Sequence, residues 1–126
     1  MERTVLIVED TDSGLDALEV ALDRIPGVRT RIVRTAEEAL HCLAQNQQHI
    51  CAIITDLHLP QMDGFELIEA VRSQPGRLAL PILVISGDSD PGTPLRLETL
   101  GISGYFPKPF SPTEVRNRLE QLIYAS

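Results

Sequence analysis

Short apolar runs alternate with longer segments of helical period along the chain. Residues 4–8, 50–55 and 81–85 are almost continuous stretches of aliphatic and β-branched side chains. Such stretches are typical of strands that are buried on both faces of a sheet. Two further strands are predicted over 29–33, where apolar and polar residues alternate, and over 104–106.

Four of the intervening segments carry apolar residues at helical spacing. These apolar stripes lie within residues 15–25, 36–43, 65–71 and 115–123. The polar cluster 9–13 offers several capping residues for the first helix, and Thr35 is placed to cap the second. An Asp63-Gly64 turn precedes the third helix, and Ser111-Pro112 forms a cap and first helical position for the last. Pro-Gly pairs are expected to end the first and third helices.

The helix between the fourth and fifth strands is expected to be short. Two Gly and two Pro within 87–94 oppose a helix there, so we predict a helix that begins near Thr93-Pro94 and ends at Gly101. The segment 87–94 itself is predicted to be a mobile or irregular loop. Pro107 is expected to shorten the last strand, because proline lacks the N–H that a strand donates.

Five strands separated by helices predict an α/β fold of the doubly wound, flavodoxin-like (βα)5 kind. Right-handed crossovers give a five-stranded parallel sheet with helices on both faces, and the strand order 2-1-3-4-5 fits best. No repeat or linker interrupts residues 1–126, which predicts a single domain. Because the chain ends soon after the last helix, no output domain is expected.

The composition is that of an ordinary globular protein, with 43% hydrophobic and 23% charged residues. The net charge of −7 argues against non-specific binding to nucleic acid or to anionic lipid. No apolar run approaches the ~20 residues that span a bilayer, and the N-terminus lacks a signal-peptide pattern. We therefore expect a cytoplasmic protein, with no membrane contact and with Cys42 and Cys51 reduced.

Polar residues stand at the ends of four predicted strands. They are Glu9-Asp10, Asp56, Ser86 and Lys108. Since ligands of doubly wound sheets bind beyond the carboxyl ends of the strands, we expect these side chains to meet in one site. Mg²⁺ suits such carboxylates, and Lys108 would neutralise part of their remaining charge. If Asp56 attacks a phosphoryl donor, the metal and Lys108 stabilise the transferring group while Ser86 offers it a hydroxyl.

From end to end, the chain resembles a receiver domain of the two-component response-regulator family. The matching residues are Glu9-Asp10, the run DLHLPQMDG at 56–64, Ser86, Tyr105 and Lys108-Pro109-Phe110. The resemblance implies that Asp56 accepts a phosphoryl group from a histidine kinase or a histidine phosphotransfer protein. The phosphorylated chain would then change its binding to a downstream effector protein in a phosphorelay.

The resemblance also implies roles for individual residues. Asp10, Asp56 and the backbone carbonyl of His58 would bind Mg²⁺, with Glu9 acting through water. Ser86 and Tyr105 would form the conformational switch, with Lys108 as the catalytic cation beside Asp56. The Lys108-Pro109 peptide bond would be cis.

Family resemblance further implies Mg²⁺-dependent self-phosphorylation and slow autodephosphorylation rather than enzymatic turnover. A monomer or weak dimer is expected. The irregular segment 87–94 and Pro107 put in doubt the family's usual dimer through the fourth helix, fifth strand and fifth helix.

Several alternatives stay open. A Mg²⁺-dependent phosphatase with an aspartyl-phosphate usually has a second Asp two residues after the nucleophile, where His58 stands. A flavodoxin-like cofactor module is weakly supported, because no Gly-x-Gly-x-x-Gly follows the first strand. A pseudo-receiver locked in one state, or a receiver excised from a hybrid kinase, would share the same overall pattern. His41 and His49 are expected to be solvated rather than to transfer phosphate.

Overall fold

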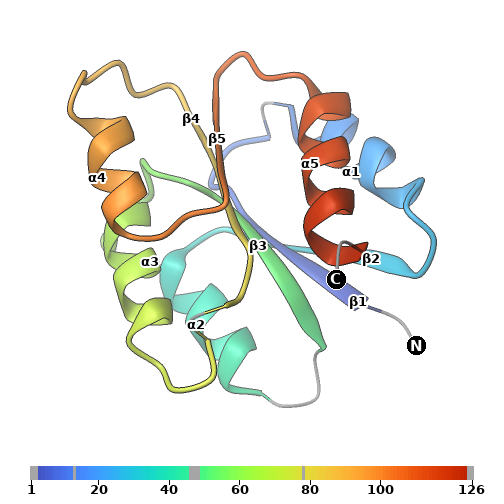
Figure 1. Cartoon of the computed structure of the whole chain (residues 1–126), viewed down its shortest axis with the longest axis horizontal. Helices are drawn as coiled ribbons and strands as arrows, with labels where there is room; N and C mark the ends of the chain where they lie inside the picture. Colours follow the sequence, from blue (N-terminus) through green and yellow to red (C-terminus); the bar gives the residue numbers. More distant parts are fainter. Residues whose placement is uncertain (1–2, 13, 46–48, 78, 125–126) are drawn as a thin grey trace.

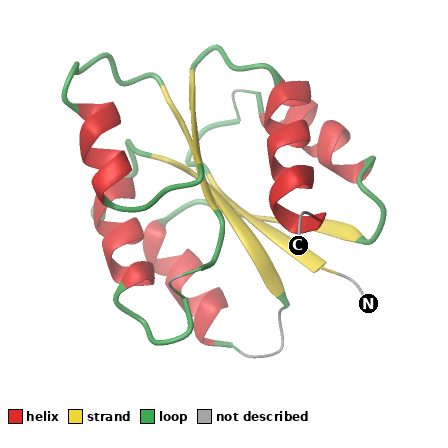
Figure 2. Cartoon of the chain, viewed as in Figure 1, coloured by secondary structure: helices red, strands yellow, loops and turns green. Residues whose placement is uncertain are grey.

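Five parallel strands form one sheet at the centre of the molecule (Figures 1 and 2). The computed structural model describes residues 3–12, 14–45, 49–77 and 79–124. The strands are β1 (Arg3–Val8), β2 (Val28–Val33), β3 (Ile50–Asp56), β4 (Ile82–Ser86) and β5 (Gly104–Pro107). Their order in the sheet is β2-β1-β3-β4-β5. The predicted doubly wound α/β fold and its strand order are confirmed.

Helices cover both faces of the sheet. They are α1 (Leu15–Asp23), α2 (Ala36–Ala44), α3 (Gly64–Arg72), α4 (Thr93–Thr99) and α5 (Pro112–Tyr124). Figure 1 shows α1 and α5 together on one face, with α2, α3 and α4 on the other. None of the helices in the described part of the chain is long and apolar enough to cross a membrane.

The alternation of side chains along each strand divides the hydrophobic core into two layers. In β1, Leu6 and Val8 face α2 and α3, whereas Val5 and Ile7 face α1 and α5. All four side chains are fully buried. Burial on both faces explains why the central strands read as continuous apolar runs in the sequence. The packed layers hold the carboxyl ends of the strands in a fixed arrangement at one edge.

Side chains cap the starts of three helices; the caps at Thr35 and Ser111 were predicted, whereas at Asp63 the sequence indicated only a turn. The Thr35 hydroxyl accepts a hydrogen bond from the Glu38 amide at 3.1 Å. Asp63 and Glu66 form a reciprocal capping box at the start of α3, and the Ser111 hydroxyl accepts from the Glu114 amide at 3.2 Å. These bonds satisfy amides that have no partner within the helix.

The prediction that the polar cluster 9–13 caps α1 was wrong. The N-cap residue is Gly14, in a left-handed conformation with φ 77°, and it supplies no side-chain hydrogen bond. Ser13 lies outside the described residues. The polar side chains of Glu9 and Thr11 are instead engaged with each other at the end of β1.

The segment before α4 is irregular and α4 itself has only seven residues, as predicted. Whether 87–94 is mobile stays a prediction. The prediction for Pro107 needs correction, because Pro107 is the last residue of β5 and lies opposite Ser86. The Lys108 amide continues the pairing with a 2.8 Å hydrogen bond to the Ser86 carbonyl. Pro107 is tolerated because β5 is an edge strand.

Both cysteines are free, with Cys42 buried and Cys51 half-buried. This agrees with the expectation that neither takes part in a disulfide framework. The Lys108-Pro109 peptide bond is cis, also as expected.

Candidate functional site

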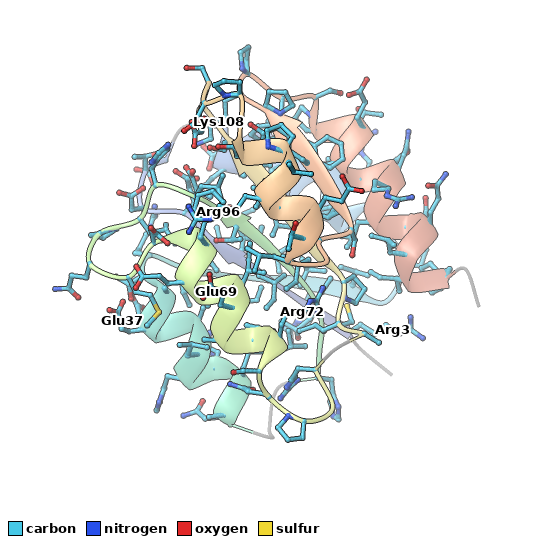
Figure 3. The ribbon with its side chains drawn as sticks, turned by 60° about the vertical axis from the view of Figure 1, so that its left-hand side comes forward. Arg3, Glu37, Glu69, Arg72, Arg96 and Lys108 are labelled. Carbon is cyan, nitrogen blue, oxygen red and sulfur yellow. The ribbon has the colours of Figure 1, made fainter. Side chains whose placement is uncertain are left out.

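Three charged side chains from different strand ends meet beyond the carboxyl edge of the sheet. Lys108 Nζ lies 2.7 Å from Asp56 Oδ2 and 3.2 Å from Glu9 Oε2. Asp56 ends β3, Glu9 follows β1 and Lys108 follows β5. Figure 3 places Lys108 at the end of the molecule where α4 begins. The prediction that these three side chains lie close together is therefore correct, because parallel strands bring their carboxyl ends to one edge of the sheet.

Asp56 is held by its own strand and by the loop that follows. Its side chain is 7% exposed, and Oδ1 accepts a hydrogen bond from the His58 amide at 3.1 Å. The Thr55 hydroxyl donates to the Asp56 carbonyl at 2.8 Å. The carboxylate is thus oriented from two sides, by an amide on one oxygen and by Lys108 on the other.

Gly64 allows the start of α3 to lie directly against Asp56. A Cβ atom at this position would be 2.3 Å from the Asp56 carbonyl oxygen and 2.7 Å from Leu57 Cα. Such distances are too short for any side chain. The sequence indicated Gly64 only as part of a turn, and its role in close packing was missed because that role depends on the approach of two elements.

Glu9 is fully buried and is fixed by its neighbour Thr11. The Thr11 hydroxyl donates to Glu9 Oε1 at 2.6 Å. Arg34, at the end of β2, donates to the carbonyl of Thr11 at 3.3 Å and forms a 2.9 Å ion pair with Asp12. The sequence pattern did not single out Thr11 or Arg34, since neither belongs to a periodic stripe.

The charges of the site shift the pKa values of its members. Burial raises the pKa of Glu9, although the hydrogen bond from Thr11 acts in the opposite direction. Burial also opposes ionisation of Asp56, but hydrogen bonds from Lys108 and from the His58 amide outweigh it and lower the pKa of Asp56. Against the effect of burial, Asp56 and Glu9 raise the pKa of Lys108. Asp56 is therefore an ionised, oriented carboxylate at neutral pH.

A group of carboxylates fits a hard divalent cation. Ligand oxygens of Glu9, Asp10 and Asp56 all lie within 4.8 Å of one another. Asp10 is exposed, whereas the other two are buried, so the cluster opens to solvent on one side. Carboxylate oxygens with an open side are the donor set that Mg²⁺ prefers, because it keeps several water ligands.

Ser86 and Tyr105 are joined through Asp88, to which each of them is hydrogen-bonded. The buried Ser86 hydroxyl accepts a hydrogen bond from the Asp88 amide at 3.0 Å. The half-buried Tyr105 hydroxyl donates to the Asp88 carbonyl at 3.2 Å. The sequence indicated Ser86 and Tyr105 as site residues. It did not indicate Asp88, which the irregular loop places between them.

Of the three histidines, His58 lies beside the site. The His58 side chain is 68% exposed and its Nε2 lies 3.8 Å from Asp88 Oδ2, so it borders the mouth of the site. His41 and His49 are exposed on α2 and before β3, as expected.

The chain is similar to known proteins over most of its length. The family model of the response regulator receiver domain matches residues 5–120. The chain is 31% identical over 121 residues to the transcriptional regulatory protein GltR of Pseudomonas aeruginosa, covering 96% of this chain and 49% of GltR. It is 33% identical over 127 residues to the alkaline phosphatase synthesis transcriptional regulatory protein PhoP of Bacillus subtilis, covering 100% and 50%. The chain thus spans about half the length of these two relatives.

A solved structure of a related protein has the same fold. The putative response regulator from Chloroflexus aurantiacus superposes with a TM-score of 0.84 at 33% identity, covering 98% of both chains.

Proposed function

Because the chain belongs to the response regulator receiver domain family, we propose that Asp56 is its phosphoacceptor in two-component signalling. The donor is a phosphohistidine of a histidine kinase or of a histidine phosphotransfer protein. The observation that carries the proposal is the buried Asp56 carboxylate, held 2.7 Å from Lys108 Nζ within a carboxylate cluster.

The transfer needs positioning and charge neutralisation more than covalent chemistry. A carboxylate oxygen of Asp56 forms a bond to phosphorus while the bond from phosphorus to the donor's imidazole nitrogen breaks. The released imidazole nitrogen takes up a proton from solvent. Lys108 lies where its ammonium group can pair with an oxygen of the transferred phosphoryl group, and the buried Ser86 hydroxyl can donate to another.

Mg²⁺ is the cation proposed for the carboxylate cluster. Asp10, Asp56 and the His58 carbonyl would hold it, with Glu9 contributing through water. When bound, it would neutralise the carboxylates and the phosphoryl oxygens. Glu9 is already oriented by Thr11, and Asp10 is exposed at the open side where a water-rich ion can enter.

Phosphorylation then shifts a two-state equilibrium that a partner protein reads. A phosphoryl group on Asp56 places new negative charge beside Ser86, whose hydroxyl is linked through Asp88 to Tyr105. The state with Ser86 turned to the phosphoryl group becomes more populated. The output is binding to an effector protein, and slow autodephosphorylation returns the chain to its first state. That residues 1–126 act as one domain stays part of the proposal.

Intact-mass measurement tests the proposal. The chain is incubated with Mg²⁺ and a small acyl phosphate, and gains the mass of one phosphoryl group. Asp56→Asn and chelation of Mg²⁺ each abolish the increment. Asp23→Asn, which changes an exposed carboxylate at the end of α1, keeps it. No increment on the native chain, with a phosphohistidine donor as well as the acyl phosphate, would favour the pseudo-receiver alternative.

A further inference from the structure

The loop that joins β1 to α1 supplies two of the three carboxylates of the proposed cation site. They are Glu9 and Asp10, which with Asp56 offer ligand oxygens within 4.8 Å of one another. The buried Glu9 carboxylate is held at both of its oxygens, by the Thr11 hydroxyl at 2.6 Å and by Lys108 Nζ at 3.2 Å. Asp10 is exposed, so packing around its side chain does not fix its place. The path of the main chain on either side of Asp10 therefore decides where its carboxylate lies.

Arg34 holds this main chain on both sides of Asp10. Its Nη1 donates to the carbonyl of Glu9 at 3.5 Å and to the carbonyl of Thr11 at 3.3 Å. Its Nη2 forms a shorter contact, a 2.9 Å ion pair with Asp12 Oδ1. Since the three contacts reach residues before and after Asp10, they restrain the loop from both directions.

The place of Arg34 is itself fixed by the elements on either side of it. Before it, Val33 ends β2, and the Val33 carbonyl accepts a 3.1 Å hydrogen bond from the Glu9 amide. After it, Thr35 is the N-cap of α2 and its hydroxyl accepts from the Glu38 amide. A paired strand end and a capped helix start leave the residue between them little freedom. Arg34 is consequently a firm anchor for the loop.

A guanidinium group suits this task better than an ammonium group. Its planar fork presents several donors at fixed angles, so one nitrogen can bond carbonyls while another pairs with a carboxylate. The charges of Arg34 and Asp12 are opposite, so the pair adds no net charge beside the carboxylate cluster. The side chain of Arg34 is 48% exposed and lies outside the hydrophobic core. Substitution of Arg34 is therefore expected to release the loop without unfolding the domain.

We propose that Arg34 is a positioning residue for the cation site, because it fixes the loop that carries Asp10. The inference rests on the proposed function, which assigns Mg²⁺ to this cluster. Arg34 is not a ligand and acts only through the main chain of Glu9 and Thr11 and through the Asp12 side chain. Groups that support metal ligands in this way contribute about 10- to 100-fold to metal affinity.

Charge and geometry make opposite predictions for the loss of Arg34. A cation near the carboxylates repels Mg²⁺, so removal of its charge alone would tighten Mg²⁺ binding. Removal of its hydrogen bonds releases the loop, so the Asp10 carboxylate is less well placed and Mg²⁺ binding weakens. Arg34→Met removes both the charge and the hydrogen bonds, whereas Arg34→Lys keeps the charge and loses the fork. The double variant Arg34→Met/Asp12→Asn keeps the net charge of the native chain and removes the ion pair.

Two quantities are measured on the full chain without a phosphodonor. One is the affinity for Mg²⁺ by calorimetric titration. The other is hydrogen exchange of the Thr11 amide in the presence of a chelator, because this amide is bonded to Glu9 Oε1 at 3.3 Å within the loop. We expect Arg34→Met and the double variant to bind Mg²⁺ about tenfold more weakly than the native chain, with faster exchange of the Thr11 amide. Arg34→Lys should lie between these variants and the native chain.

A control and a third measurement separate positioning from a general effect on the fold. Arg31→Met removes an exposed cation from β2 and should keep the native affinity for Mg²⁺. Phosphorylation by a small acyl phosphate is then followed by intact mass as the Mg²⁺ concentration rises. Arg34→Met should need about tenfold more Mg²⁺ for the half-maximal effect and should reach the native extent at saturation.

Each proposal has its own refuting result. Native or tighter binding of Mg²⁺ by folded Arg34→Met would overturn the inference and leave the proposed function intact. Absence of Mg²⁺ binding by the native chain would overturn the proposed cation site, and the inference with it. Mg²⁺ binding without phosphorylation of Asp56 would overturn the phosphoacceptor proposal alone, because the affinities of the variants would still decide the role of Arg34.

Discussion

Removal of the Lys108 ammonium group should destabilise the fold through the two carboxylates that it leaves behind. Lys108→Met keeps most of the aliphatic stem and removes the charge. The Glu9 and Asp56 side chains, at 1% and 7% exposed, then lose the cation that they share. Removing one partner of a buried ion pair typically costs about 3–5 kcal/mol.

Two features of the site place the expected loss at the lower end of this range. Lys108 is 23% exposed, so water already weakens its pairing. Uptake of a proton also limits the loss, because protonating a carboxyl group of ordinary pKa at neutral pH costs about 4 kcal/mol. We therefore expect the free energy of unfolding to fall by about 3 kcal/mol. With a urea m-value near 1.5 kcal/mol/M, the unfolding midpoint moves down by about 2 M.

Urea unfolding in the presence of a chelator measures this loss. Arg24→Met is the matched control, since Arg24 is an exposed cation after α1. Asp56→Asn in the Lys108→Met background should recover about 2 kcal/mol, because a single buried carboxylate then remains. An unfolding midpoint for Lys108→Met equal to that of Arg24→Met would refute the reasoning. It would mean that the charge of Lys108 does not stabilise the buried carboxylates of Glu9 and Asp56.

Three further outcomes are expected. Gly64→Ala should lower the free energy of unfolding by about 3 kcal/mol in urea, because its methyl group would lie 2.3 Å from the Asp56 carbonyl; Gly87→Ala, with open space around it, should change little. Asp63→Ala should lower thermal stability by about 1 kcal/mol through loss of the capping box, and an unchanged melting temperature would contradict that role. Hydrogen bonds from the Asp90 amide and the Thr93 hydroxyl lower the pKa of Asp88 in the folded state, so its contribution is complete above the ordinary aspartate pKa and is lost as the pH falls through the lowered value. The stability difference between the native chain and Asp88→Ala should accordingly vanish on acidification.

The main outline of the fold and the charged centre of the site could be predicted from the sequence. Continuous apolar runs identify strands buried on both faces, and parallel strands share one carboxyl edge. The residues that follow such runs, Glu9, Asp56 and Lys108, therefore had to lie near one another. Their distances confirm that expectation.

The supporting contacts of the site could not be predicted, because they depend on the paths of loops. Thr11 orients Glu9, and Asp88 joins Ser86 to Tyr105. Each uses backbone groups or short polar side chains, which leave no periodic signal in the sequence. The prediction for the start of α1 was wrong for a similar reason. Gly14 takes the N-cap position in a left-handed conformation, and the side chain of Thr11 bonds Glu9 instead of capping the helix.

The small contact area of α4 has a consequence for local unfolding. Within α4 only Thr93 and Leu97 are buried, and the Arg96 guanidinium lies 3.8 Å from the centre of the Phe65 ring of α3. A buried leucine contributes about 1.5–3 kcal/mol and a cation–π contact at the surface about 0.5–1 kcal/mol. This sum is below the 5–15 kcal/mol typical of a whole domain. α4 can therefore open as a separate unit while the sheet and the carboxylate cluster stay folded.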